Sequence, residues 1–269
     1  MPVDQATKAE RFKALHEGPP FVIPNPWDAG SAKLLAALGF EALATTSGGF
    51  AMTLGRLDGD VTLEEKAEHI SQLNAATDLP VSADLENGYG DDPEDAARTI
   101  TRAAEAGAVG GSIEDYGAEM GIYDLEFAVE RVQAAVEAAA KLDFPFTLTA
   151  RAENHFRVKD ADLDDTIERL NAYGNAGADV VYAPGLKSVE QIKEVCDAVS
   201  KPVNVLGYDK LSLAEIEKAG AQRISIGGGL ATTSLAAVAA AAKKIRDEGD
   251  FSLLTRGVPV DEWFGGEDR

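Results

Sequence analysis

The stretch AAEAGAVGGSIED, residues 103–115, carries the pattern that decides the fold. It begins with an alanine-rich segment typical of a helix, continues through Gly107, and ends in a short apolar run that turns acidic at Glu114. Glycine directly after a helix accommodates the left-handed cap, and the tight return leads into the next strand. The stretch therefore predicts a helix–glycine–strand unit.

The same unit occurs three more times along the chain. A helical segment and a glycine precede the β-branched runs at 41–46, 179–182 and 222–226. Apolar runs of this length are typical of strands buried on both faces. Helix starts are marked by capping boxes at 62–65, 188–191 and 212–215, where a hydroxyl and a Glu or Gln satisfy free amide groups.

From the same pattern we expect eight strands, near 20–24, 41–46, 80–85, 109–114, 146–151, 179–183, 202–206 and 222–226. Helices are expected near 30–38, 62–76, 93–106, 124–141, 160–176, 188–199, 212–219 and 230–247. Strict alternation predicts an α/β fold with a parallel sheet, and eight repeats in 269 residues fit a TIM (β/α)8 barrel. A doubly wound open sheet is the alternative, but no Gly-x-Gly-x-x-Gly follows the first strand. We expect a single barrel domain over 1–269, in which 230–269 form a C-terminal helical segment.

Composition narrows the function classes. The chain has 25 Lys and Arg against 46 Asp and Glu, a formal net charge of −21. Such a surface repels nucleic acid and anionic membranes, so neither is expected as a partner. No apolar run is long enough to span a bilayer, and the first residues lack an apolar signal core. The only cysteine, Cys196, lies on the apolar stripe of a helix, so we expect a buried structural thiol and a cytoplasmic protein.

Acidic residues stand where the strands end. Asp84 and Glu86 lie two apart at the end of one strand, which predicts that they point the same way, and Glu114 ends the next. Three neighbouring carboxylates repel one another unless protons or a cation lie among them, and Mg²⁺ prefers such oxygen ligands. The alternative is that 86–90 form only a polar turn. Asp115 is expected to be a turn residue or a helix cap.

The end of the fifth strand carries a cation. Arg151 closes a run otherwise suited to burial, so it must pair with Glu153 or with a carboxylate or phosphate of a substrate. A structural ion pair is the alternative. All these residues lie at the carboxyl ends of strands, where barrels carry out their chemistry. The long loop at 47–60, with several glycines, is a candidate lid over that end.

These motifs together resemble the isocitrate lyase / phosphoenolpyruvate mutase superfamily. The residues that carry the resemblance are Asp84-x-Glu86-x-Gly88-Tyr89-Gly90, Glu114-Asp115, Ala150-Arg151-x-Glu153, the run 24–32 (PNPWDAGSA) and Thr45-Thr46-Ser47-Gly48. Their order and spacing extend over roughly residues 20–230. The resemblance implies a magnesium-dependent barrel, with Mn²⁺ as a possible substitute, that breaks or forms C–C or P–C bonds in small 2-oxo or dicarboxylic acids.

The resemblance also implies roles for individual residues. Asp84 would bind the metal most directly, with Asp58, Glu86 and Glu114 acting through waters. The substrate carboxylate would be held by Thr46, Ser47 and Gly48, with Arg151 as a further anchor; Trp27 and Asn204 are additional candidate substrate-binding residues. Family members usually form dimers and tetramers in which the last barrel helix is exchanged, so 230–247 would be that helix in a homo-oligomer.

One loop departs from the family pattern. Family lyases carry a Lys-Lys/Arg-Cys-Gly-His segment after the fourth strand, whereas residues 116–124 read YGAEMGIYD and hold no cysteine, lysine or histidine. The lysine and asparagine of the phosphonomutases are absent from it as well. Tyr116, Glu119 and Tyr123 are the remaining candidates for acid–base chemistry in this loop. We therefore expect a lyase or decarboxylase, with phosphonomutase chemistry and a non-catalytic 2-oxo acid binder as alternatives.

Overall fold

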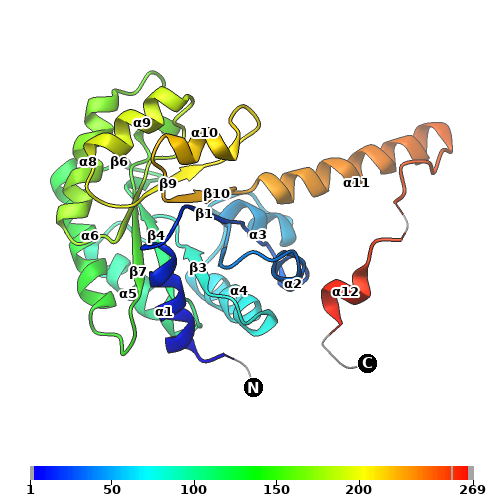
Figure 1. Ribbon diagram of the computed structural model, residues 1–269, viewed down its shortest axis with the longest axis horizontal. Coiled ribbons are helices and arrows are strands. Elements are labelled where there is room, and N and C mark those ends of the chain that lie inside the picture. The colour runs from blue at the N-terminus through cyan, green and yellow to red at the C-terminus, as the bar shows by residue number, and fades with distance from the viewer. Residues whose placement is uncertain (1–2, 256, 266–269) are drawn as a thin grey trace.

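Eight parallel strands curl into a nearly closed barrel with helices around it (Figure 1). The structure, a computed structural model, describes residues 3–255 and 257–265. Neighbouring strands follow the order β1-β10-β9-β8-β7-β4-β3-β2. Their bounds are β1 (Phe21–Ile23), β2 (Leu43–Ala44), β3 (Val81–Asp84), β4 (Gly110–Glu114), β7 (Thr147–Arg151), β8 (Val180–Tyr182), β9 (Val203–Leu206) and β10 (Arg223–Ser225). All eight predicted strands are present, each somewhat shorter than expected.

The barrel closes between β1 and β2 through a few polar contacts. Ala44 N donates to the carbonyl of Pro24 at 3.0 Å, just past the end of β1. The buried Asn25 side chain donates to Thr45 O at 3.0 Å and accepts from the amides of Ile226 and Gly227, each at 2.8 Å. One asparagine thus joins the carboxyl ends of β1, β2 and β10 and fixes the loops that follow them.

The predicted helices surround this sheet. They are α2 (Ala29–Ala37), α4 (Leu63–Ala76), α5 (Pro93–Glu105), α6 (Leu125–Ala139), α8 (Leu163–Asn175), α9 (Val189–Ala198), α10 (Leu213–Lys218) and α11 (Gly229–Glu248). The glycines of the four helix–glycine–strand units, Gly39, Gly107, Gly177 and Gly220, have φ between 89° and 111°. That is the left-handed region that glycine enters without strain, so the caps are confirmed.

Several elements were not predicted. They are α1 (Gln5–Leu15), α3 (Ser47–Thr53), α7 (Asn154–Arg157) and a small hairpin of β5 (Tyr116–Gly117) and β6 (Gly121–Ile122). A further helix, α12 (Val260–Phe264), lies within the C-terminal helical segment expected over 230–269. The expectation of a loop over 47–60 is wrong for its first half, which forms α3. Two glycines give this segment poor helix propensity, but Phe50 and Ala51 are buried, and tertiary packing outweighs propensity here.

Cys196 also differs from expectation. It is half-buried rather than fully buried, and it packs at the edge of the core. Its Cβ lies so close to Gly220 that a Cβ added to this glycine would come within 2.9 Å of it. Burial raises the pKa of its thiol to about 11. The thiol is therefore protonated at neutral pH and unreactive, as its place on an apolar stripe indicated.

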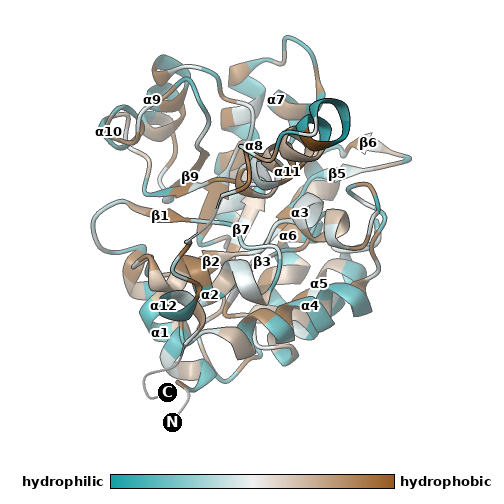
Figure 2. Ribbon diagram, turned by 90° about the vertical axis from the view of Figure 1, so that its right-hand side faces the viewer, coloured by the Kyte–Doolittle hydropathy of each residue, from teal (hydrophilic) through white to brown (hydrophobic). Residues whose placement is uncertain are grey.

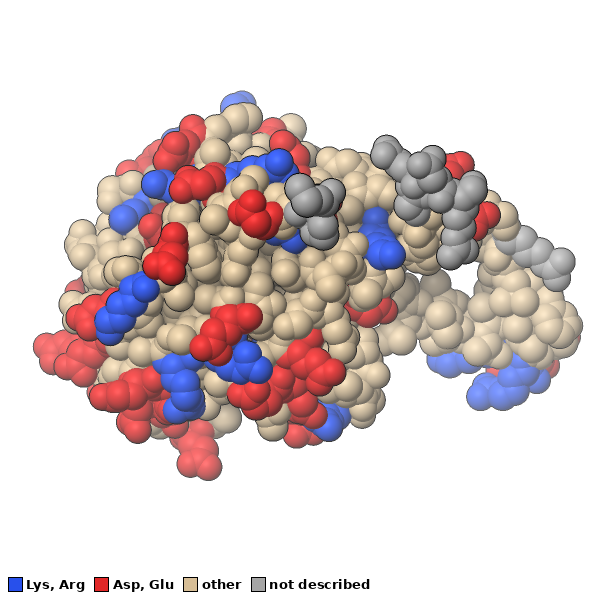
Figure 3. Space-filling model, turned by 90° about the horizontal axis from the view of Figure 1, so that it is seen from below, with Lys and Arg blue, Asp and Glu red and all other residues tan. Residues whose placement is uncertain are grey.

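The last helices form an arm. α11 projects from the barrel and only Ala231 of its 20 residues is buried, while α12 returns to contact α2 (Figure 1). Figure 2 shows apolar turns along α11 before its charged end. Figure 3 shows open space between the arm and the barrel. The same view shows acidic side chains in several groups on the barrel. Within 3–255 and 257–265, α11 included, no helix has both the length and the apolar composition needed to cross a bilayer.

The amino-terminal end of the barrel is closed by α1. Its Phe12 is fully buried beneath β4, and a Cβ at Gly110 would come within 2.7 Å of the Phe12 ring. Around Phe12 lie Phe21, Ile23, Ala42 and Val109, which form a small separate core. The barrel therefore depends on a helix outside the eight repeats for the packing of its lower layer.

Replacing Phe12 with alanine should destabilise the protein by about 3–5 kcal/mol, because a fully buried ring leaves a cavity that the strands cannot fill. Urea denaturation followed by circular dichroism measures the loss. Glu10→Ala on the exposed face of the same helix is the matched control and should change little. Equal stability of the two variants would contradict the proposed role of α1.

Candidate active site

The carboxyl ends of β3, β4 and β7 bring three charged side chains together. Strand register places Asp84 beside Ser112, and Glu114 beside Arg151. The Arg151 guanidinium lies between the two acids, with Nη1 3.0 Å from Asp84 Oδ1 and Nη2 3.1 Å from Glu114 Oε2. The predicted convergence of Asp84, Glu114 and Arg151 is thus confirmed in the structure.

Arg151 has a third partner in Glu153. Its Nε and Nη2 donate to Glu153 Oε1 at 2.9 and 2.7 Å, and Glu153 is completely buried. One guanidinium therefore faces three carboxylates, which leaves the strand-end cluster (Asp84, Glu114, Arg151 and Glu153) short of positive charge. Burial, together with Glu153 and Asp84, raises the pKa of Glu114 to about 8 despite the nearby Arg151.

Asp84 keeps its charge in this environment. Burial opposes its ionisation, but Arg151 and Lys66 together hold the pKa of Asp84 below its usual value. The amide of Ser47 also donates to Asp84 Oδ2 at 3.1 Å. Of Asp84 and Glu114, only Asp84 has a pKa below its usual value, so it is the better anionic ligand for a cation.

Glu86 reaches the same region by a route that the sequence did not predict. β3 ends at Asp84, and Glu86 has a φ of 50°, so the two do not share a strand face as expected. The left-handed residue begins the turn that Gly88 N closes on Leu85 O at 2.8 Å. Burial raises the pKa of Glu86 to about 7, and the nearby charge of Asp84 contributes to this shift. Tyr89 donates its hydroxyl proton to Glu86 Oε1 at 3.2 Å.

The segment after β2 forms the opposite wall. Thr46 caps α3 by accepting from Gly49 N at 3.2 Å, and a Cβ at Gly49 would lie only 2.4 Å from Thr46 and 3.1 Å from Trp27. A Cβ at Gly48 would lie 3.4 Å from the carboxylate carbon of Asp58. The missing side chains of the two glycines thus let Trp27, Thr46 and Asp58 close in around the start of α3.

Three predicted residues lie less centrally. Tyr116 is linked to the cluster through Arg157, whose guanidinium carbon lies 4.2 Å from the Tyr116 ring centre. Glu119 is exposed at the turn between β5 and β6 and makes no hydrogen bond or ion pair with another described residue. Asn204 is buried in the barrel, where it accepts from Arg223 Nε at 2.8 Å and donates to Ser225 Oγ at 3.0 Å.

Other residues of the site were not singled out by the sequence. Arg157, on α7, places Nη2 3.6 Å from Glu114 Oε1 and is the more exposed of the two arginines. Lys66 is fully buried beside the site, and its spacing from the buried His69, Ile70 and Leu73 is the signal that would have found it.

Asp115 has a structural role, and the expectation of a turn residue or cap is wrong. It is buried and accepts from Glu153 N at 2.7 Å, Tyr173 Oη at 2.5 Å and Arg169 Nη1 at 3.1 Å. These bonds anchor the backbone of Glu153 behind Arg151. Asp115 thus positions the cluster without joining it, because its own oxygens are already occupied.

The donor chemistry of the site suits a divalent cation held partly through water. Within the described residues, no three His, Cys, Asp or Glu side chains are close enough to ligate one ion directly. The reason is that Arg151 occupies the space between Asp84 and Glu114. Carboxylate oxygens with raised pKa values nevertheless favour added positive charge, and Mg²⁺ usually keeps several waters. These residues fit the ligand set that the resemblance implies, in which Asp84 would bind the metal directly and Glu86, Glu114 and Asp58 would act through waters.

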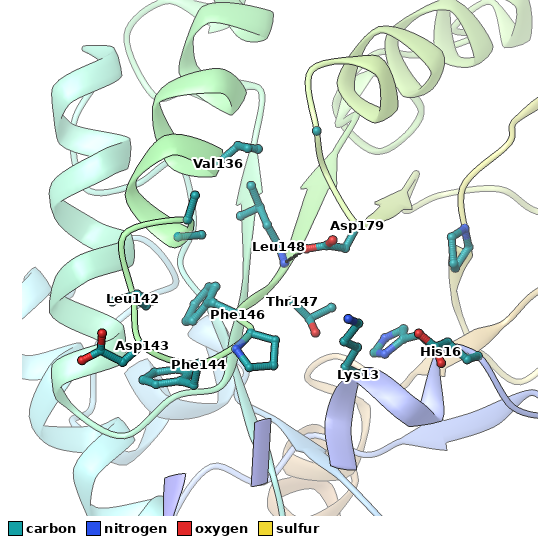
Figure 4. A pocket seen from close by; sticks show the side chains of 16 residues that line it. Lys13, His16, Val136, Leu142, Asp143, Phe144, Phe146, Thr147, Leu148 and Asp179 are labelled. Atoms are coloured by element: carbon teal, nitrogen blue, oxygen red, sulfur yellow. Dashed lines mark hydrogen bonds between the residues drawn. The ribbon is translucent and has the colours of Figure 1, made fainter. Parts of the chain in front are cut away.

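A separate cavity lies away from this cluster. A groove of about 640 Å³ opens at the amino-terminal end of the barrel, between α1, α6 and the start of β7 (Figure 4). Figure 4 shows Val136, Leu142, Phe144 and Phe146 lining it, with Lys13 and His16 on its α1 side. None of its lining residues belongs to the strand-end cluster, so this cavity is separate from the candidate active site.

Comparisons with known proteins identify the family of the chain. The family model of phosphoenolpyruvate phosphomutase matches residues 12–246. The chain belongs to this family. It is therefore a member of the isocitrate lyase / phosphoenolpyruvate mutase superfamily, which confirms the resemblance carried by the motifs.

Similar proteins include one of known structure and two relatives. The structure of a lyase/mutase candidate from Burkholderia cenocepacia J2315 is 51% identical, with a TM-score of 0.94 and 98% of both chains covered. An uncharacterized Mycobacterium tuberculosis H37Rv protein is 32% identical over 92% of both chains. An oxaloacetate decarboxylase of Bradyrhizobium diazoefficiens is 30% identical over 94% of this chain and 87% of its own. Other members are 2-methylisocitrate lyases, so lyases are frequent among the relatives.

The raised pKa values predict how stability depends on pH. A carboxyl whose folded pKa lies above its unfolded value stabilises the protein while protonated, and that stability is lost as pH rises through the folded pKa. For Glu86 and Glu114 the loss extends from about 4.5 to their folded pKa values of about 7 and 8. Burial lowers the pKa of His16 and His69 to about 3. These histidines therefore add stability as the pH rises toward 6.5, their unfolded pKa, and contribute no further change above it.

Between about pH 6.5 and 8, therefore, the two histidines no longer contribute, and the two carboxyls should cost the metal-free protein on the order of 1–2 kcal/mol. Thermal melts in EDTA across this range measure it. Glu114→Gln removes the larger contribution and should flatten the dependence, whatever its own melting temperature. A wild-type stability that rises over this range would contradict the raised pKa values.

Proposed function

We propose that this chain is a magnesium-dependent lyase that cleaves a C–C bond in a small 2-oxo acid or dicarboxylate, with oxaloacetate as the first substrate to test. The observation that carries the proposal is the strand-end cluster, in which one guanidinium faces three carboxylates at the catalytic end of a barrel. Support comes from the oxaloacetate decarboxylases and 2-methylisocitrate lyases among the relatives.

The residues divide the work as follows. Asp84, together with Glu86, Glu114 and Asp58 through waters, would hold Mg²⁺ or Mn²⁺. When bound, the ion would polarise the 2-oxo group and stabilise the negative charge that develops there. Backbone amides at the start of α3 line the site. Ser47 N donates to Asp84 and Gly49 N donates to Thr46. Gly48 N, between them, would donate to the substrate carboxylate. Trp27 closes this side.

Decarboxylation suits the residues of the 116–124 loop. In oxaloacetate the C3–C4 bond breaks, carbon dioxide leaves, and the electron pair passes to the 2-oxo group. The enolate formed then takes a proton from water at C3 to give pyruvate, so no cysteine is needed for acid–base chemistry. The structure agrees with this limited demand, since Glu119 is exposed and the Tyr123 hydroxyl is bonded to Asp91 Oδ1 at 2.5 Å. Arg151 and Arg157 supply positive charge toward a substrate carboxylate.

Purified protein with Mg²⁺ should convert oxaloacetate to pyruvate and carbon dioxide, and Asp84→Asn should lower kcat/KM by about a thousand-fold because the principal cation ligand is lost. A coupled pyruvate assay measures the rate, with the metal-catalysed background in protein-free buffer subtracted. Asp143→Asn, at an exposed position at the opposite end of the barrel, is the matched control and should retain full activity. Turnover that is equal in the Asp84 variant would exclude this function.

Phosphonomutase chemistry is the second candidate, because the matching family model is that of phosphoenolpyruvate phosphomutase. Phosphorus NMR of phosphonopyruvate incubated with the protein separates the two reactions. Binding of oxaloacetate without turnover of any compound in a substrate panel would instead indicate a 2-oxo acid binding protein.

We also propose that the protein is a homo-oligomer, a dimer or tetramer, built on the arm. Leu235 and Val238 of α11 are 51% and 65% exposed, and Phe251, Leu253 and Leu254 continue this apolar surface. Such a surface on a projecting helix is typical of an interface with another copy. A Leu235→Asp, Val238→Asp double variant should therefore shift the mass measured by light scattering after gel filtration to that of a monomer. A wild-type monomer would contradict the proposal.

A further inference from the structure

The two arginines of the site differ in how fully they are bonded. Each guanidinium nitrogen of Arg151 contacts a carboxylate of Asp84, Glu114 or Glu153, at distances between 2.7 and 3.1 Å. Its side chain is only 14% exposed. A guanidinium surrounded in this way has little capacity left for another carboxylate. Arg151 is therefore committed to holding the strand-end cluster together.

Arg157 lies beside two of the same acids without being bonded to them. Its Nε is 3.4 Å from Glu153 Oε2, and its Nη2 is 3.6 Å from Glu114 Oε1. Neither contact is a hydrogen bond: Glu153 Oε2 is buried without a hydrogen-bond partner, and the Arg157 guanidinium makes no hydrogen bond with any described residue. The Arg157 side chain is 35% exposed. Its N–H donors are therefore available to a ligand that enters from solvent.

Aromatic rings hold this guanidinium in place. Its central carbon lies 4.2 Å from the ring centre of Tyr116 and 5.2 Å from that of Phe156. Stacking on an aromatic face orients an arginine without using its N–H donors. Tyr116 begins the 116–124 loop that departs from the family pattern. This loop thus contributes to the site by supporting a cation.

Arg157 lies across the strand-end cluster from α3. The amide of Ser47, at the start of α3, donates to Asp84, and Arg151 joins Asp84 to Glu114. Arg157 contacts Glu114 from α7, which follows β7, and β3 and β4 separate β7 from β2 in the sheet. A substrate with one carboxylate at the start of α3 would therefore have Arg157 toward its other end.

We propose that Arg157, rather than Arg151, binds the second carboxylate of the substrate and makes the site selective for dicarboxylates. The inference rests on the proposed function, because that function assigns the first carboxylate to the start of α3. The planar fork of an arginine matches a carboxylate through two parallel hydrogen bonds, which a ligand that ends in a methyl group cannot form.

The contact should act mainly on binding. In oxaloacetate the second carboxylate loses its charge as carbon dioxide leaves, so its bond to Arg157 is strongest before the reaction. An interaction of this kind lowers KM more than it raises kcat. Arg157→Met should therefore raise the KM for oxaloacetate by a larger factor than it lowers kcat.

Calorimetric titration with malate and with 2-hydroxybutyrate, both in the presence of Mg²⁺, tests the inference. These ligands share a four-carbon chain and differ only at C4, which is a carboxylate in malate and a methyl group in 2-hydroxybutyrate. Wild-type protein should bind malate at least ~10-fold more tightly, and Arg157→Met should remove at least ~10-fold of this preference by weakening malate binding alone. Arg157→Lys keeps the charge without the planar fork and should retain only part of the preference.

Matched variants separate this contact from general effects. Arg11→Met removes an exposed arginine of α1, at the opposite end of the barrel, and should leave both affinities unchanged. Tyr116→Ala removes the stacked ring and should lower the malate preference, whereas Tyr116→Phe should keep it. Circular dichroism checks that each variant is folded. Should Arg157→Met not fold, Arg157→Lys, which keeps a positive charge beside Glu114 and Glu153, decides the question.

The outcomes distinguish this inference from the proposed function. A malate preference that stays at the wild-type level in the folded Arg157 variants would overturn the role of Arg157. Wild-type protein that binds the two ligands equally, or binds neither, would overturn it as well. A preference that is lost in the Arg157 variants of a protein without oxaloacetate turnover would support Arg157 and count against the lyase function alone.

Discussion

The ion pairs of Arg151 are the constraint on which the rest of the site depends. Its guanidinium contacts Asp84 from β3, Glu114 from β4 and Glu153 after β7, each within 3.1 Å. Breaking a buried network of this kind leaves uncompensated charge, so three neighbouring strands must keep their register. Burial and the neighbouring carboxylates of Glu153 and Asp84 raise the pKa of Glu114 within this network, although Arg151 and Arg157 oppose the effect.

Around this network, other buried residues hold the site in place without taking part in its chemistry. Asn25 joins the ends of β1, β2 and β10, and so sets where Trp27 and the start of α3 lie. Asp115 holds the backbone of Glu153 from behind. Both residues are buried polar groups with their hydrogen bonds satisfied, an arrangement that specifies one geometry. The chemistry then follows from which charges this geometry brings close together and deprives of water.

Much of the fold was predictable, because the signal repeats. Each helix–glycine–strand unit marks its own boundary, and four glycines adopt the left-handed caps that the pattern indicated. α1 and α3 were not predictable in the same way. Phe12 is buried only because the barrel end needs filling, and α3 forms over two glycines because Phe50 is buried. Neither cause is local, so no window of sequence contains it.

The sequence by itself determined the barrel and the convergence of Asp84, Glu114 and Arg151, because the carboxyl ends of parallel strands meet at one edge whatever the details. It did not determine how Glu86 arrives, since that depends on a left-handed turn after β3, nor that Asp115 supports the site. Only the tertiary structure decided that Lys66 is buried against Thr45 and that Arg151 fills the space between two acids. The physical reason is that strand order and helix period fix which face a residue occupies, whereas burial and charge balance depend on every element packed around it.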